Sequence, residues 1–384
     1  MATWRLDPAT THLNHGSFGA TPSEVLDHQS ALRSEMEHNP VDFMMRQYQP
    51  LLEASRSAVA SFVGADADGL VFVPNATYGV NSVLRSLEPQ LRPGADILIT
   101  NHTYNACRNA AAETARRIGG QLVVADIPFP IDDPQAVVEA VCAAVTPSTR
   151  VVVLDHITSA TALILPVRQI IATLDPELLV LVDGAHAPGM IDVDLGALGA
   201  TFYTANCHKW MCAPKGAAFL WVADEFRDTI GAVAVSHGYN DGWPSSASRF
   251  HAQFDWTGTD DPTARLSVPT ALAVLGTHLP GGWPAIQASN HALVHQGREL
   301  LTAALDTDTP TPAEMIGSIA SLPIPLDRYP GHNALDVVES LHDNWSIEVP
   351  VSPWPAPEDR LLRISAQQYN TLNDYELLAR ALIS

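Results

Sequence analysis

The sequence contains very little lysine. It has 384 residues and 21 basic side chains, yet only Lys209 and Lys215 are lysines. Arginine keeps its proton, whereas a lysine amine can lose its proton and attack a carbonyl to form a Schiff base. Lysine scarcity is also typical of GC-rich genomes, which leaves open why both lysines fall in one short segment. Residues 209–215 are therefore a candidate reactive segment.

Cysteine and charged residues are scarce as well. The four cysteines form no evenly spaced framework in a chain of this length, so we interpret them as reduced thiols and expect a cytoplasmic protein. Charged residues make up 16% of the chain, and the formal net charge is −21. Such an acidic chain repels phosphate backbones and anionic membrane surfaces, so neither nucleic acid nor membrane is an expected partner.

Long apolar runs are absent too. No stretch approaches the ~20 apolar residues that span a bilayer. Residues 1–19 carry Arg5, Asp7 and His12 and lack the apolar region of a secretory signal. Hydrophobic residues nevertheless make up 46% of the chain, enough for a large core. Because 384 residues exceed the usual size of one hydrophobic core, we expect two lobes.

Short apolar segments alternate with helix-like segments such as Ala106–Ile118 and Pro134–Ala144. This rhythm predicts an α/β fold whose large domain has a mainly parallel seven-stranded sheet with helices on both faces. The strand candidates are Leu70–Val73, Asp96–Thr100, Gln121–Ala125, Val151–Leu154, Leu178–Val182, Ala200–Thr204 and Ala217–Val222.

The pattern stops between Ser236 and Pro262, a stretch rich in Gly, Ser, Asp and aromatic residues. We interpret it as a long loop that is functional or buried by a partner. Helix-like segments and a final strand, Leu361–Ser365, follow and predict a small C-terminal α+β domain. We expect the large domain over residues 20–265 and the small domain over residues 1–19 and 266–384.

Ligands of an open parallel sheet bind beyond the carboxyl ends of its strands. The first strand leads into Asn75 and Thr77 at a turn that opens a helix, where free N–H groups and the helix dipole suit a phosphate. An ordinary capped helix is the alternative. After the second strand come His102 and Tyr104, either of which is able to lay a ring over a flat cofactor or simply to form a wall.

Two acids follow buried strands directly: Asp155, which precedes His156, and Asp183, which precedes His186 by three residues. An acid in such a place needs a cationic or hydrogen-bonding partner. A protonated pyridine nitrogen is one such partner for Asp183, and a cationic ring stabilises a carbanion at a substrate α-carbon. An N-cap or Asx turn is the alternative role.

Lys209 follows the next strand and reaches the same edge of the sheet. Strand ends that supply phosphate, ring and aldehyde contacts together indicate a cofactor site. The rival interpretations are a surface lysine, a zinc site at Cys207, His208 and Cys212, and a metal hydrolase. The hydrolase would use Asp155, His156, Asp183, His186 and His208 as ligands but gives Lys209 no role. We therefore expect no metal.

Asp183–Gly189 followed by His208–Trp210 resembles the class V aminotransferase-like enzymes, which depend on pyridoxal 5′-phosphate (PLP). The likeness is greatest to the isopenicillin N epimerase and hercynylcysteine sulfoxide lyase-like group. It extends from Leu13–Gly19 to Arg363–Asn370. The resemblance implies PLP as the cofactor and the PLP-dependent transferase fold of type I.

The resemblance also implies roles at the cofactor. Lys209 would be the Schiff-base lysine, Asp183 the partner of the pyridine nitrogen, and His186, with Ser159 nearby, the contact of the ring hydroxyl. Tyr104 would stack on the ring, with His102 as the alternative. The implied phosphate contacts are Asn75, Ala76, Thr77, Asn206 and His208.

Further implied residues concern the substrate and a second copy of the chain. Arg363 matches an arginine that forks onto a substrate carboxylate, a geometry that guanidinium suits, with Asn14 and His15 nearby; a structural salt bridge is its alternative. The segment Trp256–Asp260 resembles one that reaches the partner's cofactor in a homodimer. Its contact residues would be Thr257, Gly258 and Thr259.

We expect Lys209 to take the α-proton of an amino acid or small peptide-like substrate. Return of a proton to the opposite face gives an epimerase and needs a second acid, for which His15, Tyr104 and His208 are candidates. Loss of a side-chain substituent gives a C–S lyase instead, and proton delivery to the cofactor gives an aminotransferase. A catalytically silent PLP-fold binding module also stays open. No cysteine follows Cys212, so the persulfide chemistry of cysteine desulfurases is not expected.

Overall fold

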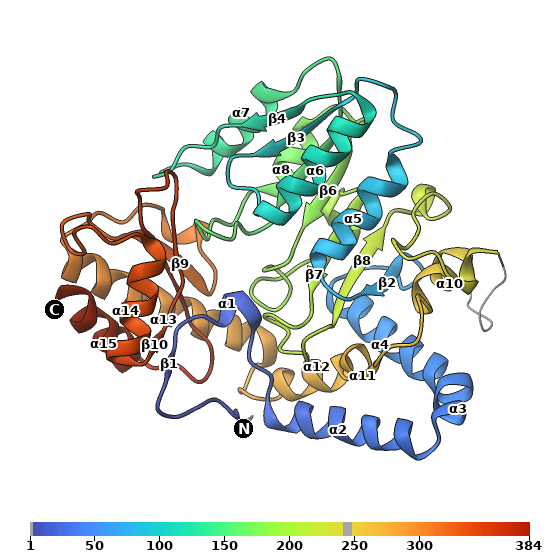
Figure 1. Ribbon diagram of the computed structural model, residues 1–384, viewed down its shortest axis with the longest axis horizontal. Coiled ribbons are helices and arrows are strands. Elements are labelled where there is room, and N and C mark those ends of the chain that lie inside the picture. The colour runs from blue at the N-terminus through green and yellow to red at the C-terminus, as the bar shows by residue number, and fades with distance from the viewer. Residues whose placement is uncertain (1–2, 241–247) are drawn as a thin grey trace.

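The predicted seven-stranded sheet is confirmed in the computed structural model, which describes residues 3–240 and 248–384 (Figure 1). Its strand order is β2-β8-β7-β6-β5-β3-β4, and only β8 runs antiparallel to its neighbours. The strands are β2 (Leu70–Val73), β3 (Asp96–Thr100), β4 (Leu122–Ala125), β5 (Thr149–Asp155), β6 (Leu179–Asp183), β7 (Phe202–Asn206) and β8 (Ala218–Val222).

Helices cover both faces of this sheet because alternate strand residues are buried on opposite sides. Val71 and Val73 of β2 belong to a buried cluster that includes residues of α5, α6 and α10, whereas Leu70 and Phe72 belong to a second cluster that includes residues of α4, α7 and α8. The bounds are α4 (Tyr48–Phe62), α5 (Ala76–Leu87), α6 (Asn105–Ile118), α7 (Pro134–Ala144), α8 (Val167–Thr173) and α10 (Arg249–Asp255).

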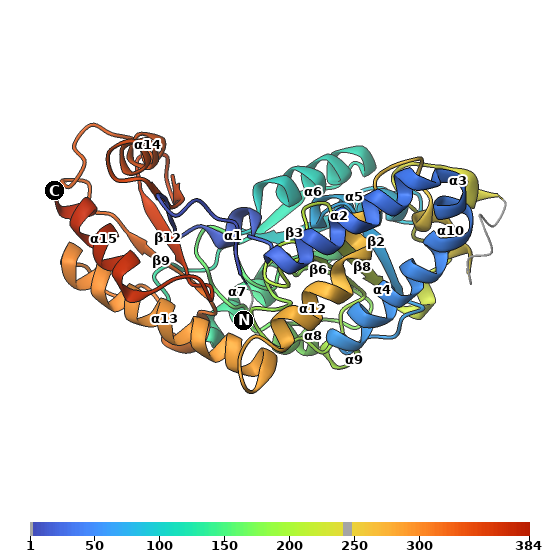
Figure 2. The same cartoon turned by 90° about the horizontal axis from the view of Figure 1, so that it is seen from below.

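A smaller lobe has a hydrophobic core of its own (Figure 2). Its antiparallel sheet has the order β11-β12-β9, and Leu13 from the N-terminal segment packs into its core. β1 (Thr11–His12) also pairs with β10 (Ile347–Glu348), so the chain's beginning joins the lobe made by its end. The other elements are β9 (Ile319–Pro323), β11 (Val351–Ser352), β12 (Leu361–Ser365), α13 (Gly282–Leu305), α14 (Ala334–Trp345) and α15 (Leu372–Ile383).

Shorter helices connect the two lobes. α12 (Val268–Gly276) follows the predicted domain boundary in the sequence, yet packs against α2 (Ser23–His38) and α4 of the large lobe. The boundary at residues 265 and 266 therefore stays a prediction. The remaining helices are α1 (His15–Phe18), α3 (Pro40–Asp42), η1 (Phe43–Gln47), α9 (Leu195–Leu198), η2 (Asp224–Phe226), η3 (His237–Tyr239), α11 (Thr263–Leu266) and η4 (Ala313–Met315).

The structure corrects the predicted loop over Ser236–Pro262. Residues 241–247 lie outside the described part, but Arg249–Asp255 forms α10, whose first turn is capped by the Ser248 side chain. Phe250 and Phe254 of this helix are buried against β2. Seven residues are too few for a helical period to stand out in a sequence.

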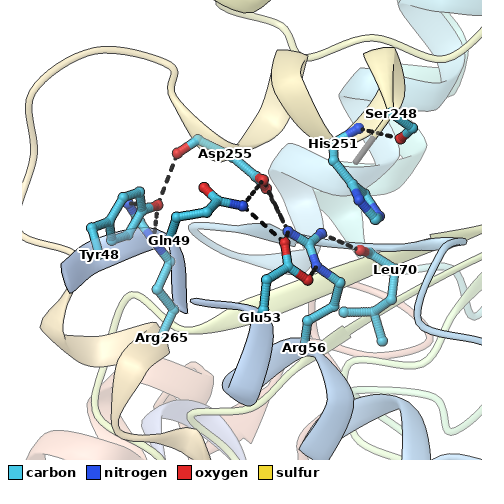
Figure 3. A network of polar contacts seen from close by, with 9 residues as sticks. All are labelled: Tyr48, Gln49, Glu53, Arg56, Leu70, Ser248, His251, Asp255 and Arg265. Carbon is cyan, nitrogen blue, oxygen red and sulfur yellow. Dashed lines mark hydrogen bonds and ion pairs between the residues drawn. The ribbon is translucent and has the colours of Figure 1, made fainter. Parts of the chain in front are cut away.

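A buried ion pair joins α4 to α10 (Figure 3). The Arg56 guanidinium donates to both carboxylate oxygens of Asp255 at 2.9 Å and to the Leu70 carbonyl at 2.7 Å. Arg56 is fully buried and Asp255 is 4% exposed. The Tyr48 hydroxyl donates to the Asp255 carbonyl, so both the backbone and the side chain of Asp255 are bonded to α4. Arg56 also pairs with Glu53 at 3.2 Å, whereas Arg56 is the cation that pairs with Asp255 in the described part of the chain, so removing Arg56 would leave the Asp255 carboxylate buried without an ionic partner.

We predict that Arg56→Met lowers the free energy of unfolding by about 3–5 kcal/mol, because an uncompensated buried carboxylate is left behind. Chemical denaturation of purified protein measures this loss. Arg5→Met, which breaks the exposed Arg5–Asp27 pair, is the matched control and should cost at most about 1 kcal/mol. An Arg56→Met loss no larger than that of the control would contradict the role of this pair.

Candidate active site

The predicted cofactor residues largely converge on one pocket at the carboxyl edge of the sheet. The parallel strands β2, β3, β5, β6 and β7 all end there, as expected for an open parallel sheet. α1 adds Ser17 to the wall. The pocket is lined by Ser17, Asn75, Ala76, Thr77, Tyr104, Asp155, Ile157, Ser159, Asp183, Ala185, His186, Asn206, His208 and Lys209.

Lys209 lies in the turn after β7, with its amine in contact with His186. The Nζ atom is 3.1 Å from His186 Nε2, and the Trp210 indole N–H donates to His186 Nδ1 at 3.3 Å. Burial, followed by the nearby Arg363 charge, lowers the pKa of Lys209 to about 8. The amine is therefore more readily deprotonated than an ordinary lysine.

Asp183 ends β6 and is held by two donors. Its Oδ1 accepts from the Ala185 N–H at 2.9 Å, and its Oδ2 accepts from the Cys107 thiol at 3.1 Å. The first contact is an Asx turn, which is the alternative role weighed for this residue. Asp183 nevertheless lines the same pocket as Lys209, so its carboxylate is also available to a ligand in that pocket.

Asp155 is a pocket residue that the sequence suggested only as a metal ligand. It ends β5 and is paired in register with Asp183 on the neighbouring strand. Its Oδ1 accepts from the Tyr104 N–H at 3.3 Å, and its buried Oδ2 has no partner at hydrogen-bond distance among the described residues. Burial and, next, the Asp183 charge raise the pKa of Asp155 well above its usual range. The signal available in the sequence was its position directly after a buried strand.

The start of α5 forms an anion-binding end of the pocket. The Asn75 side chain caps the helix by accepting from the Tyr78 N–H, and Asn206 Oδ1 accepts from the Ala76 N–H. The Thr77 N–H has no acceptor among the described residues. It therefore offers a donor, at a helix N-terminus, to an anion in the pocket.

His208 lines the same end of the pocket. Its Nδ1 bonds the Ala217 carbonyl at 2.9 Å, and burial lowers its pKa to about 4. Gly19 fixes the N-terminal segment against this turn: its φ is +69°, and a Cβ there would lie 2.2 Å from the His208 carbonyl oxygen. Only glycine suits both conditions.

Of the two candidates for a stacked ring, Tyr104 lines the pocket and His102 does not. His102 is buried, with Nδ1 bonded to Thr161 and Nε2 to the Ile127 carbonyl. Its ring packs against Phe129 and Trp354. The structure thus places His102 in a packed cluster of its own, and Tyr104 carries the stacking role as a proposal.

Arg363, on β12 of the small lobe, does not line the pocket itself but contacts two residues that do, Ser17 and Ser159. It donates to the Ser159 carbonyl at 2.7 Å and to the Ser17 hydroxyl at 3.0 Å, with Asn14 Oδ1 at 3.4 Å. Burial lowers its pKa to about 10. No carboxylate within the described ranges forms an ion pair with it, in contrast to the structural salt bridge considered from the sequence.

His15, in contrast, lies behind the pocket instead of lining it. Its Nε2 is 3.1 Å from the Lys209 carbonyl, and its Nδ1 is 3.1 Å from the Tyr369 hydroxyl. Burial lowers its pKa to about 4. His15 therefore contacts the backbone of Lys209. Because it does not line the pocket, its predicted roles as substrate contact or second acid gain no support from the structure.

Thr257, Gly258 and Thr259 do not line this pocket. They lie in a surface segment whose two ends are both held by ion pairs: Asp255 by Arg56 at one end and Asp260 by Arg265 at the other. The segment is thus presented outward on the large lobe, as a contact with a second copy would require.

The donor set fits PLP. A buried amine suits the aldehyde, the Asp183 carboxylate suits a protonated pyridine nitrogen, and the α5 N-terminus suits a phosphate. The rival metal ligands diverge: His156 bonds the Tyr203 hydroxyl, and His186 bonds Trp210. In the described part of the chain, no three His, Cys, Asp or Glu side chains form a group that could hold a metal. No helix there is long and apolar enough to traverse a bilayer.

Comparisons with known proteins agree with this geometry. The family model described as Aminotransferase class-V matches residues 8–378. Isopenicillin N epimerase of Amycolatopsis lactamdurans is 34% identical over 389 residues, with 98% of this chain and 95% of the relative covered. Putative L-cysteine desulfhydrase 1 of Oryza sativa subsp. japonica is 30% identical over 408 residues, with 98% and 83% covered.

A solved structure shares the fold. It is a C-DES mutant with glycine covalently linked to its PLP cofactor, and it matches with a TM-score of 0.80 at 19% identity. The match covers 98% of this chain and 96% of the other. The predicted transferase fold of type I is thereby confirmed.

We predict that Asp155→Asn stabilises the protein relative to wild type as the pH rises. The folded chain keeps the Asp155 proton to a higher pH than the unfolded chain does, so the contribution of Asp155 to stability is full below its unfolded pKa and is lost as the pH rises through its raised folded pKa. Apparent Tm values of both proteins between pH 5 and pH 8 measure the widening difference.

Asp96→Asn is the matched control. Asp96 is also a buried strand carboxylate, but both of its oxygens accept hydrogen bonds, from the Gln121 N–H and the Thr146 hydroxyl. Its amide variant should lose stability at neutral pH. A wild-type Tm that gains on Asp155→Asn as the pH rises would refute a neutral Asp155.

Proposed function

The chain belongs to the class V aminotransferase family, and from this premise we propose an enzyme that removes the α-proton of an amino acid, with epimerisation as its reaction. Family membership confirms PLP as the cofactor. The single observation that carries the proposal is the placement of Lys209 and Asp183 in one pocket. When bound, PLP supplies a cationic ring that withdraws electrons from the substrate α-carbon.

Lys209 is proposed to hold the cofactor as a Schiff base and then to act as the base. Its lowered pKa, about 8, leaves an appreciable fraction of neutral amine near neutral pH. The other lysine, Lys215, is exposed and does not line the pocket. The chain therefore offers one lysine for both tasks.

Arg363 is proposed to bind the substrate carboxylate. Its guanidinium is buried directly behind Ser17 and Ser159, which line the pocket. Its hydrogen-bond partners in the described part of the chain are all neutral oxygens, so no carboxylate there compensates its charge. A buried cation of this kind favours an anionic ligand. Binding at Arg363 would turn the α-carbon of an amino acid towards Lys209.

Epimerisation needs a second acid on the face opposite Lys209. Of the three candidates, Tyr104 and His208 line the pocket and His15 does not. Tyr104 is 48% exposed, so its hydroxyl can exchange a proton with solvent. We propose Tyr104 for this step.

A C–S lyase is the second candidate reaction. A relative with 30% identity over nearly the whole chain is described as a cysteine desulfhydrase, which supports loss of a sulfur substituent as strongly as the epimerase relatives support inversion. Both reactions begin with the same proton removal by Lys209. They differ in the next step, which is loss of the sulfur substituent in the lyase and return of a proton to the α-carbon in the epimerase.

A homodimer is proposed as the working form. The segment of residues 257–259 is held outward by two ion pairs and does not reach the pocket of its own chain. We propose that it approaches the cofactor of a second copy. The division into a large domain of residues 20–265 and a small domain from the rest is part of the same proposal.

The test of function is a panel of amino acids incubated with the PLP-loaded protein in deuterated water. Deuterium at Cα with mixed chirality supports the epimerase, and release of a keto acid with ammonia supports the lyase. Lys209→Ala should lower the exchange rate at least about 100-fold, because both base and Schiff base are lost. Lys215→Ala is the matched control and should keep the rate. A wild-type protein that exchanges no amino acid's α-proton would refute the proposal.

We predict that Arg363→Lys raises KM for amino-acid substrates about tenfold or more with a smaller change in kcat, since an ammonium cannot donate as a fork. An amine that lacks the carboxylate should bind both proteins alike. Arg360→Lys is the control, because Arg360 immediately precedes β12 but donates to the Tyr329 and Pro325 carbonyls, and it does not line the pocket. An equal rise in KM in Arg360→Lys would contradict a specific carboxylate contact.

A further inference from the structure

Trp210, His186 and Lys209 form a chain of polar contacts at the back of the pocket. The Trp210 Nε1–H donates to His186 Nδ1 at 3.3 Å, and His186 Nε2 lies 3.1 Å from Lys209 Nζ. Trp210 is 1% exposed and His186 is 3% exposed, so the contact between the indole and the imidazole is shielded from water. Lys209 lies on the pocket side of the imidazole and lines the pocket.

The indole fixes where the imidazole proton lies. An indole nitrogen is only a donor, so His186 Nδ1 must accept and cannot carry a proton. A neutral imidazole carries one proton, which then resides on Nε2. The Nε2–H points to Lys209 Nζ, and an amine accepts a hydrogen bond only when it is neutral, because an ammonium has no lone pair.

The imidazole itself stays neutral in this place. Burial lowers the pKa of His186 well below its usual range, and the charges of Lys209 and Arg363 lower it further. The Lys209 amine has no carboxylate within ion-pair distance among the described residues. A hydrogen bond donated to the neutral form of a base favours that form.

We propose that Trp210 is a positioning residue whose indole N–H holds His186 in the Nε2–H tautomer, so that His186 keeps the Lys209 amine neutral. The protonation states follow from the contacts alone. Their consequence for catalysis rests on the proposed function, because a neutral amine is what both Schiff-base formation and α-proton removal require.

Other groups around Lys209 act independently of Trp210. Arg363 on β12 favours the neutral amine, whereas Asp183 on β6 and Cys107 on α6 favour the ammonium. His15 on α1 contacts the backbone carbonyl of Lys209 and not its amine. A change confined to the indole N–H leaves all four in place, so its effect isolates the contact through His186.

Trp210→Phe tests the proposal, because it keeps a ring against His15 while it removes the N–H. His186 is then free to accept from a lysine ammonium, so the pKa of Lys209 should rise by about one unit or more, a tenfold change in the ratio of ammonium to amine. The full chain, labelled with ¹⁵N-lysine and freed of cofactor, shows only two side-chain signals, and Lys215→Arg assigns them.

Trp221→Phe is the matched control. Trp221 is also a buried tryptophan, but its indole N–H has no acceptor in the described part of the chain. The pKa of Lys209 should not change in this variant. A rise equal in both variants, or absent from Trp210→Phe, overturns the proposal. Because no cofactor is present, this outcome is separate from whether the protein turns over amino acids.

A second measurement needs no variant and therefore does not depend on how Trp210→Phe folds. The ¹⁵N shifts of the His186 ring in the wild-type chain at pH 8 identify which nitrogen carries the proton. The proposal requires a protonated Nε2 and a bare Nδ1. A proton on Nδ1 overturns it.

Discussion

The burial of one amine opposite one carboxylate is the constraint on which the rest of the site depends. Asp183 ends β6, and Lys209 lies in the turn that follows the adjacent strand β7, so both side chains line the same pocket at this edge of the sheet. Charged groups in such a place are costly unless they are paired or neutralised. The surrounding contacts lower the free-energy cost of burying these two groups without a direct ion pair between them.

The pocket meets this cost by distributing protons and charge. Asp183 receives two hydrogen bonds, whereas Asp155 beside it has an oxygen without a partner among the described residues and a raised pKa that favours its neutral form. Burial and, next, the Arg363 charge lower the pKa of Lys209. The site thus favours a neutral Lys209 amine, a neutral Asp155 and an anionic ligand at Arg363.

Much of this arrangement could be predicted from the sequence, because buried parallel strands are short apolar runs and active groups follow their ends. The bounds of β2, β3 and β12 match the predicted ones, and Lys209, Asp183, His186 and Tyr104 share the pocket. α10 was missed because its two buried phenylalanines lie in a segment too short to show a period. His102 and His15 were misplaced as candidates, since proximity in sequence to a strand end does not tell whether a ring turns into the pocket or away from it. Trp210 belongs to a motif that carries the family resemblance, but no role for it could be predicted from the sequence, because the proposed role depends on the direction of one N–H bond.

Borohydride reduction of the PLP-loaded protein, followed by peptide mapping, tests the central claim most directly. Reduction converts a Schiff base into a stable pyridoxyl group on the lysine that held it. The account predicts that this group is found on Lys209 and that Lys215 is unmodified. A pyridoxyl group on Lys215 alone, or a cofactor released without any covalent mark, would contradict it.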